Sequence, residues 1–326
     1  MGAAMPLLLT EQDVRALLDM PAAIKAVEES LLRQATGDGW THPRRRLALP
    51  ERVFLNYMFA ADQKAGWMGA KLYSVAHGVA RFMVLLYRAD SGELAALIEA
   101  DYLGQVRTGA ASAVATKYMA RPEARVLGII GTGTQARTQL AAVGQVRELD
   151  SIRAFGRDPT RLEKYCREMT ETLRKPVTPA TSAEATVRGV DILITATTAM
   201  NPVVSGAWLS PGTHINAIGA NFAQKRELET DAVDRAGIIA VDSIQQANIE
   251  SGDLIQAFGD DNSRWPQVRE LCEIVAAKRP GRKNPEQITL FKSNGIASWD
   301  LAVGAHVFER AEKQGLGSKI EFGSHR

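Results

Sequence analysis

The chain has 326 residues, of which 45% are hydrophobic and 23% charged, values that are ordinary for a globular protein with room for about two domains. Thirty-nine Lys and Arg against 37 Asp and Glu give a net charge of +2, which argues against binding to nucleic acid or to an acidic membrane. Cys166 and Cys272 match no metal-ligand spacing, so we expect free thiols and no metal site. The start lacks a signal peptide and no apolar run could span a bilayer, which predicts a cytoplasmic protein.

The first hundred residues predict two helices followed by short strands. Thr10 to Asp13 resembles a capping box, and a second helix begins near Pro21 and ends before Gly37. The segments expected to form strands are 52–58, 68–74, 80–87 and 94–99, the last two joined by a hairpin turn at 89–93. We therefore expect the N-terminal third to be α+β, with an antiparallel sheet.

Beyond this region strands and helices alternate. An Ala-rich helix is expected at 110–119, and the chain after Pro280 is basic and loop-like until a last helix at 301–314. The expected strands are 126–130, 151–155, 177–180, 191–195, 214–218 and 238–242, and the expected helices lie at about 134–147, 158–173, 182–188 and 246–257. Such alternation predicts an α/β fold with a doubly wound parallel sheet that binds ligands at the carboxyl ends of its strands.

A glycine-rich turn directly follows the apolar run 126–130 and consists of Gly131, Thr132, Gly133, Thr134, Gln135 and Ala136. In such a G-x-G-x-x-A turn the first glycine makes the bend, the second lets phosphates approach the backbone, and the small last residue packs helix on strand. Backbone N–H groups and the helix N-terminus then bind a dinucleotide pyrophosphate. The motif alone is weak, but the strand before it and the helix after it favour a dinucleotide site over a structural turn.

The end of the second strand of this region bears on the choice between NAD and NADP. Rossmann proteins selective for NAD usually carry Asp or Glu there, which binds the ribose 2′-OH. This chain has Arg157 instead, and a guanidinium suits a 2′-phosphate through paired charge-assisted hydrogen bonds. The alternative is a solvated loop before a helix. We therefore expect NADP(H), with NAD(H) also usable.

Basic residues of the N-terminal third are candidates for binding an anion. Lys71 lies inside an apolar strand, and a buried lysine must be paired or shifted in pKa, both of which are common at catalytic sites. Arg107 enters the Ala-rich helix, and residues 44–46 are three consecutive arginines. For these arginines, a solvated surface position is the plainer alternative.

Together these pieces resemble the ornithine cyclodeaminase/mu-crystallin family, from about Thr10 to Ala311. The motifs that carry the resemblance are Pro43 to Arg45, Ala70-Lys71, Arg107 to Ala110, Gly131 to Ala136, His214 to Ala220, Arg226 to Leu228, Val241 to Ser243, Glu250 to Asp253 and Phe291 to Gly295. The resemblance implies a homodimer, a nicotinamide cofactor and a small amino-acid or cyclic-imine substrate. It also implies a Rossmann dinucleotide-binding domain over 122–291 and a second α+β domain, for substrate binding and dimerisation, formed by 1–121 and 292–326.

The resemblance also implies roles for single residues. Arg45 and Arg107 would hold the substrate carboxylate, and Lys71 would contact this carboxylate or the reacting nitrogen. Bidentate arginine fixes the orientation of a carboxylate, and orientation is much of what hydride transfer needs. No role is implied for His77 or Arg81. The cofactor would be bound at its phosphates by Thr108, at its ribose by Thr197 and Thr198, and at its nicotinamide by Asn294 and Gly295.

Asn221 departs from the family's cyclodeaminases, which carry an aspartate at this position. An amide cannot act as a general base at neutral pH, although it can still form hydrogen bonds with an imine or a water. Asn221 therefore argues against ornithine cyclodeaminase and favours a simpler reductase. We expect Lys71 and Asn221 to be its catalytic residues. We expect an oxidoreductase that uses NAD(P)H to reduce a ketimine carboxylate, such as 1-pyrroline-2-carboxylate or 1-piperideine-2-carboxylate, to a cyclic amino acid.

Three alternatives stay open. The first is an amino-acid or N-alkyl amino acid dehydrogenase that resembles the archaeal alanine dehydrogenases of the family. The second is ornithine cyclodeaminase itself. The third is an NADPH-dependent ligand-binding protein of the mu-crystallin type, although the combination of Arg45, Lys71 and Arg107 favours an enzyme.

Overall fold

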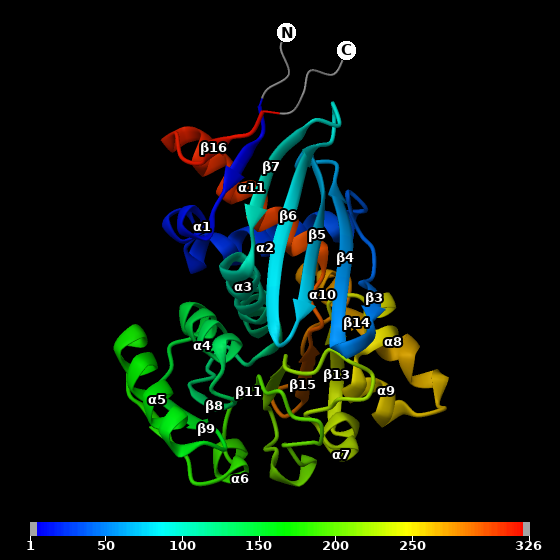
Figure 1. Cartoon of the computed structure of the whole chain (residues 1–326). Helices are drawn as coiled ribbons and strands as arrows, with labels where there is room; N and C mark the ends of the chain where they lie inside the picture. Colours follow the sequence, from blue (N-terminus) through cyan, green and yellow to red (C-terminus); the bar gives the residue numbers. More distant parts are fainter. Residues whose placement is uncertain (1–4, 322–326) are drawn as a thin grey trace. The chain divides into compact units, whose positions relative to one another are not determined.

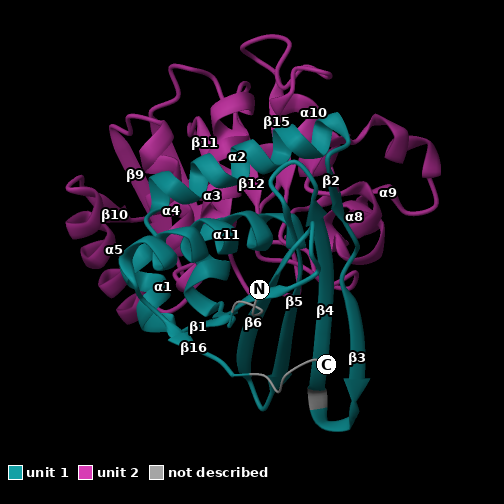
Figure 2. Ribbon diagram, turned by 90° about the horizontal axis from the view of Figure 1, so that it is seen from above, with its two compact units in different colours: residues 1–107, 296–326 teal, residues 108–295 magenta. Residues whose placement is uncertain are grey.

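The computed structural model describes residues 5–321, which fall into two compact units. Unit 1 comprises the described parts of 1–107 and 296–326, and unit 2 comprises 108–295 (Figure 2). The chain passes from unit 1 to unit 2 inside helix α3 (Asp101–Met119). Arg107 therefore belongs to unit 1 and Thr108 to unit 2, whereas the sequence prediction placed both residues in one domain.

Unit 1 is built on an eight-stranded sheet in the order β16-β1-β7-β6-β5-β4-β2, with β3 paired to β4. The strands from β2 to β7 are antiparallel, as predicted, while β1 runs parallel to β7 (Figure 1). The strands are β1 (Leu7–Leu9), β2 (Gly39–Thr41), β3 (Arg45–Leu49), β4 (Val53–Asp62), β5 (Trp67–Ala76), β6 (Val79–Arg88), β7 (Leu94–Glu99) and β16 (Ser318–Lys319). The prediction missed β1, β2, β3 and β16, which are short and lie at or near the edges of the sheet.

The helices of unit 1 begin at clear capping signals. Thr10 and Asp13 form the predicted capping box at α1 (Glu11–Leu17), because each side chain accepts a hydrogen bond from the backbone N–H of the other. Helix α2 (Met20–Thr36) ends at Gly37, whose φ of 88° suits glycine. The last helix, α11 (Ala297–Gln314), begins four residues before the predicted start and packs on α2 and on strands β4 and β5.

Helix α3 begins at Asp101, well before the predicted start at 110, so Arg107 lies within the helix rather than ahead of it. The cause is a cap from a distant part of the chain. The Glu11 carboxylate accepts hydrogen bonds from the backbone N–H groups of Asp101, at 2.6 Å, and Tyr102, at 3.1 Å. A carboxylate at these positions stabilises a helix N-terminus, and no local pattern reveals it.

Unit 2 contains an eight-stranded sheet in the order β10-β9-β8-β11-β12-β15-β13-β14, and every pair in it is parallel. This confirms the predicted doubly wound sheet. The strand order reverses between β8 and β11, and ligands of such folds bind at this switch point. The strands are β8 (Val126–Ile130), β9 (Ser151–Phe155), β10 (Val177–Pro179), β11 (Ile192–Thr195), β12 (His214–Ala217), β13 (Ala236–Val241), β14 (Arg269–Glu270) and β15 (Ile288–Lys292).

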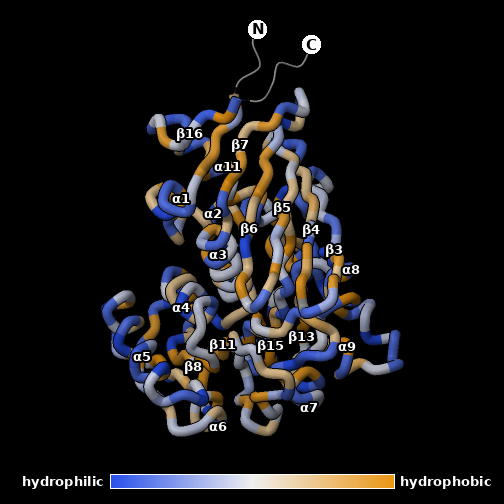
Figure 3. The backbone as a smooth tube through the Cα atoms, viewed as in Figure 1, coloured by the Kyte–Doolittle hydropathy of each residue, from blue (hydrophilic) through white to orange (hydrophobic). Residues whose placement is uncertain are grey.

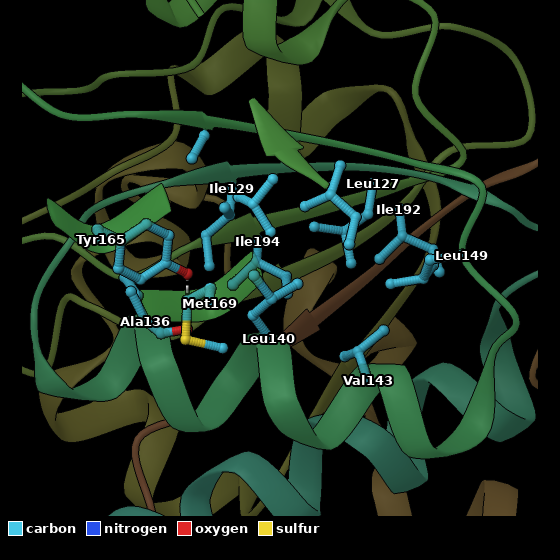
Figure 4. Packing of buried hydrophobic residues seen from close by; sticks show 14 of the residues in the cluster. Leu127, Ile129, Ala136, Leu140, Val143, Leu149, Tyr165, Met169, Ile192 and Ile194 are labelled. Atoms are coloured by element: carbon cyan, nitrogen blue, oxygen red, sulfur yellow. Dashed lines mark hydrogen bonds between the residues drawn. The ribbon is translucent and has the colours of Figure 1, made fainter. Parts of the chain in front are cut away.

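Helices of unit 2 cover the sheet and bury a core of Leu, Ile, Val and Met side chains. On one side the core includes Leu127, Ile129 and Leu140, and the Tyr165 hydroxyl donates to the Ala136 carbonyl at 3.1 Å (Figure 4). Helix α5 is mainly hydrophilic along its length, in keeping with one narrow buried stripe (Figure 3). The helices are α4 (Thr134–Val146), α5 (Pro159–Leu173), α6 (Ala183–Val187), α7 (Thr230–Asp234), α8 (Ile244–Glu250), α9 (Gly252–Phe258) and α10 (Leu271–Val275).

Two predictions about unit 2 are wrong. The helix predicted over 246–257 is broken at Ser251 into α8 and α9, and Gly252 packs so closely that a Cβ atom there would lie 1.9 Å from the Lys225 carbonyl oxygen. The stretch after Pro280 holds a buried strand, β15, within the sheet. The strand was not predicted because it contains Lys292, and a charged residue is rare in a buried strand.

Candidate functional site

Unit 1 contains a buried ionic cluster of Lys71 on β5, Arg107 on α3 and Asp300 on α11. The Lys71 Nζ atom lies 2.6 Å from Asp300 Oδ1, and the Arg107 Nε–H donates to the same oxygen at 3.1 Å. The three residues are only 4%, 6% and 1% exposed, respectively. Two cations that share one carboxylate leave a net positive charge, which suits an anionic ligand.

The local sequence explains why Lys71 is buried. Its cross-strand neighbours, Met58 on β4 and Val84 on β6, are both buried, so the pleat directs Lys71 to the covered face of the sheet. Gly104 on α3 leaves room for the ammonium group, because a Cβ atom there would lie 3.1 Å from Nζ. Asp300 lies in the first turn of α11, where the helix dipole favours a negative charge.

The pKa of Lys71 is lowered to about 8. Burial is the main cause, and the charges of Arg107 and Arg44 add to it, while the Asp300 carboxylate opposes it. For Asp300, burial by itself raises the pKa, but the two cations outweigh it and the pKa lies below its ordinary value. Lys71 is therefore protonated at neutral pH and can lose its proton slightly above it, as a proton donor in catalysis requires.

Arg44, and not Arg45, is the residue of the arginine run beside this cluster. Arg44 is buried, with its guanidinium carbon 6.0 Å from the centre of the Tyr73 ring, which stacks on Phe82. Arg45 begins β3, pairs with Tyr57 of β4 and is exposed. Adjacent residues of an extended chain point to opposite sides, which explains the difference. The substrate-binding role expected for Arg45 stays a prediction.

No role was predicted for His77 or Arg81, and both are exposed: His77 lies in the turn between β5 and β6, and Arg81 lies in β6 opposite Ser74. His77 adopts a φ of 51° in this turn.

In unit 2 the glycine-rich turn has the geometry that a pyrophosphate needs. Gly131 follows β8 with a φ of 117°, and a Cβ atom there would lie 2.3 Å from the Ala196 carbonyl oxygen. Gly133 caps α4 without a side-chain hydrogen bond, and a Cβ atom there would have nothing within 4 Å. The start of α4 therefore offers backbone N–H groups to an anion. The residues present fit a dinucleotide.

Arg137 holds this turn in place from the first turns of α4. Its Nη1–H group donates to the carbonyl oxygens of Thr132, at 2.7 Å, and Gly133, at 3.1 Å, and its Nε–H donates to Glu168 of α5 at 3.0 Å. In a trans peptide the following N–H points opposite to the carbonyl, so Arg137 directs the N–H groups of the turn away from itself. The sequence analysis did not single out this residue.

The other residues predicted for the cofactor site mostly follow strand ends of unit 2. Because the sheet is parallel, its strand ends gather at one edge. Thr108 is the exception, since it lies buried in α3. Arg157 follows β9 and is exposed, and Thr197 and Thr198 follow β11. The half-buried Asn221 follows β12, and Asn294 and Gly295 follow β15. The remaining predicted residues lie in or beside the glycine-rich turn: Thr132, Thr134, Gln135 and Ala136.

A family model described as the ornithine cyclodeaminase/mu-crystallin family matches residues 5–315. The chain belongs to this family. The match confirms the resemblance inferred from the motifs and extends it by a few residues at each end.

Two relatives with solved structures share the fold along their whole length. The structure of Thermococcus litoralis Delta(1)-pyrroline-2-carboxylate reductase, in complex with NADH and L-proline, is 35% identical, covers 96% of this chain and 100% of its own, and has a TM-score of 0.92. An archaeal alanine dehydrogenase dimer with bound NAD is 32% identical, covers 98% of this chain and 99% of its own, and has a TM-score of 0.91. In sequence, Delta(1)-pyrroline-2-carboxylate reductase of Bacillus cereus is 37% identical over 241 residues, 74% of each chain.

Asp300 is the member of the buried cluster that the sequence analysis missed. The predicted helix began at 301, so Asp300 was assigned to the loop before it. The available signal was a lone carboxylate in the apolar stretch 296–303, which is rare without a functional or pairing role. Across residues 5–321 we find no group of three His, Cys, Asp or Glu side chains that could hold a metal ion, and no helix long and apolar enough to cross a membrane.

Proposed function

We propose that this family member is an NAD(P)H-dependent reductase of ketimine carboxylates, which converts a substrate such as 1-pyrroline-2-carboxylate to the cyclic amino acid. The observation that carries the proposal is the buried cluster of Lys71, Arg107 and Asp300, which offers cations for a carboxylate and a proton for an imine. The similarity to two Delta(1)-pyrroline-2-carboxylate reductases supports this substrate class.

In this mechanism Arg107 binds the substrate carboxylate. Its Nη1 atom is buried and has no hydrogen-bond partner among the described residues, so it can donate to a ligand. Arg44 adds positive charge near Lys71. Together the two guanidinium groups orient the ring of the imine.

Lys71 then supplies the proton that the reaction consumes. A nicotinamide cofactor held at the glycine-rich turn of unit 2 would supply the hydride for the imine carbon. The electron pair of the C=N bond passes to the nitrogen, and Lys71 protonates this nitrogen from its ammonium group. Asp300 keeps Lys71 charged until that step, because its carboxylate opposes the effect of burial on the lysine pKa. Asn221 can hold the substrate nitrogen or a water by hydrogen bonds but cannot remove a proton, which disfavours cyclodeamination.

For the cofactor we propose a preference for NADP(H), with NAD(H) also accepted. The support is Arg157, which follows β9 and is exposed, so its guanidinium is available to a 2′-phosphate. The two similar structures hold NADH and NAD, so the preference is tested separately by the substitution Arg157→Ala.

We also propose that the protein is a homodimer. The outer face of the β3–β4 pair carries Leu47, Leu49, Leu55 and Phe59, whose exposed fractions are 58%, 57%, 47% and 47%. A contiguous apolar face of this kind on a soluble protein indicates a protein interface. Replacing Leu47 and Leu55 by Glu, and measuring the molar mass by light scattering, tests the proposal: the mass should fall from that of two chains to that of one.

The function is tested by oxidation of NADPH or NADH by the purified protein. The proposal expects oxidation with 1-pyrroline-2-carboxylate or 1-piperideine-2-carboxylate and no need for added amine. Turnover of pyruvate only with ammonia or methylamine would support the alanine dehydrogenase alternative, which the second similar structure favours. Proline and ammonia from ornithine would support a cyclodeaminase, and cofactor binding without any turnover would support a binding protein.

A further inference from the structure

Three of the family motifs meet in a buried polar group of unit 2 that has no part in the proposed mechanism. We propose that Glu227, Asp253 and Lys292 form a positioning triad that sets the nicotinamide half of the cofactor site, and that its negative charge favours the oxidised cofactor. The three residues come from the motifs 226–228, 250–253 and 291–295. This inference rests on the proposed function only in that unit 2 binds a nicotinamide cofactor.

The Glu227 carboxylate accepts hydrogen bonds from the ends of two neighbouring strands, β11 and β12. Its Oε1 atom accepts the backbone N–H of Thr197 at 2.7 Å, and its Oε2 atom accepts the N–H of Gly219 at 2.7 Å and the Thr195 hydroxyl at 2.8 Å. Thr195 is the last residue of β11, and Gly219 follows β12. A Cβ atom at Gly219 would lie 2.5 Å from the carboxylate, so the glycine is needed for this approach.

Asp253 and Lys292 hold Glu227 from the other side. Asp253 Oδ1 accepts the backbone N–H groups of Glu227, at 2.6 Å, and Leu228, at 2.9 Å. The Lys292 Nζ atom lies 3.2 Å from Asp253 Oδ2 and donates to the Ala220 carbonyl at 2.5 Å. The triad thus connects the ends of β11, β12 and β15, and Ala220 directly precedes Asn221.

All three residues are 0% exposed. With both carboxylates ionised and the lysine protonated, the triad would have a net charge of −1. Burial, and then the charge of Asp253, raise the pKa of Glu227, while Lys292 and the hydrogen bonds from Thr197 and Thr195 lower it. Both oxygens of the Glu227 carboxylate accept a backbone N–H group, from Thr197 and Gly219, and these obligate donors favour the ionised form. A buried charge of this kind is little screened by salt.

The place of the triad in the sheet determines which part of the cofactor it affects. In a doubly wound fold the pyrophosphate lies at the first glycine turn, and the second nucleotide lies over the strands beyond the switch point, here β11 and β12. The nicotinamide ring is neutral when reduced and positively charged when oxidised. An unbalanced negative charge within about 8 Å of the ring therefore strengthens binding of the oxidised form about tenfold or more relative to the reduced form.

The test compares Glu227→Gln with the wild type in the full-length protein by titration with NADPH, NADP⁺ and 2′,5′-ADP, and with NADH, NAD⁺ and ADP. We expect affinity for the adenosine fragments to stay within about twofold, because they do not reach β11 and β12. Affinity for the reduced cofactor should fall about tenfold through lost positioning, and that for the oxidised cofactor about tenfold further through lost charge. Asp253→Asn, which can keep its Oδ1 acceptor, should likewise lower the affinity for the oxidised cofactor relative to the reduced one. If Glu227→Gln does not fold, this variant tests the effect of the charge in its place.

The matched control is Asp191→Asn. The Asp191 carboxylate also accepts two backbone N–H groups, those of Arg125 and Val126, but it precedes β11 at the amino edge of the sheet. This variant should lose stability without any change in the affinity ratio. If Glu227→Gln and Asp253→Asn leave the ratio unchanged, or if Glu227→Gln weakens the adenosine fragments as much as the whole cofactors, the triad is merely structural. A wild type that binds neither cofactor pair would instead overturn the proposed function.

Discussion

Replacing Asp300 by Asn should move the pH dependence of the reaction by about two units. The change removes the carboxylate that Lys71 and Arg107 share at 2.6 and 3.1 Å. Two unit charges about 4 Å apart interact by about 4 kcal/mol at an effective dielectric constant of 20, which corresponds to about three pKa units for Lys71. Because the asparagine oxygen can still accept a hydrogen bond, we expect a smaller shift, from about 8 in the wild type to about 6.

The assay is kcat/KM for imine reduction, measured against pH. Lys71 must be protonated to donate, so activity falls as pH rises through its pKa: above about 8 in the wild type and above about 6 in Asp300→Asn. The pKa of the free imine affects both proteins equally. Asp62→Asn is the control, because Asp62 is a buried carboxylate of unit 1 that pairs with Arg33, at 2.6 Å, and not with Lys71.

Breaking the buried pair should also destabilise Asp300→Asn by about 3–5 kcal/mol, so the profile is measured at a temperature at which circular dichroism shows a folded variant. An alkaline limb within about half a unit of the wild type would refute the assignment of Lys71 as the proton donor tuned by Asp300. A shift of the pH profile in Asp62→Asn as large as in Asp300→Asn would show that loss of any buried carboxylate of unit 1 changes the profile. That result would contradict a specific role for Asp300.

Three further predictions concern stability and cofactor choice. The pKa of Lys71 is lowered from 10.5 to about 8 in the folded state, so the unfolded chain binds more protons between these two pH values. The free energy of unfolding should therefore rise with pH across this window, by up to about 3 kcal/mol. Urea titrations of Lys71→Met should lack this rise. Arg157→Ala should lower the ratio of kcat/KM with NADPH to that with NADH at least about tenfold, and an unchanged ratio would mean that another group selects the cofactor. In Gly109→Ala the new Cβ would lie 2.5 Å from the Thr138 carbonyl oxygen, so α3 and α4 must separate at a cost of about 1–3 kcal/mol, whereas Gly133→Ala, with open space around it, should unfold at nearly the wild-type urea concentration.

The parts of the fold that the sequence predicted well are those with local causes. Strand β8 and the start of α4 have the predicted bounds, because an apolar run, a glycine bend and a helical pattern follow one another within eleven residues, 126–136. The capping box at Thr10 is likewise complete within four residues. These local signals, taken in order, also indicated the family and the nicotinamide cofactor.

Distant parts of the chain decided the rest. The start of α3 depends on Glu11, which lies 90 positions before Asp101, and this start places Arg107 inside the helix. Lys71 and Asp300 are 229 positions apart and share a contact of 2.6 Å. Strand β15 lies between β12 and β13 in the sheet despite its lysine, because Asp253 is brought within 3.2 Å of that ammonium group.

The sequence by itself determined the glycine turn between strand and helix, the class of each unit and the burial of Lys71. Only the tertiary structure decided that Arg44 and not Arg45 accompanies this lysine, and that Asp300 balances its charge. The reason is that secondary structure responds to neighbours a few residues away, whereas the protonation state of a buried group depends on every charge within several ångströms, wherever in the chain that charge originates.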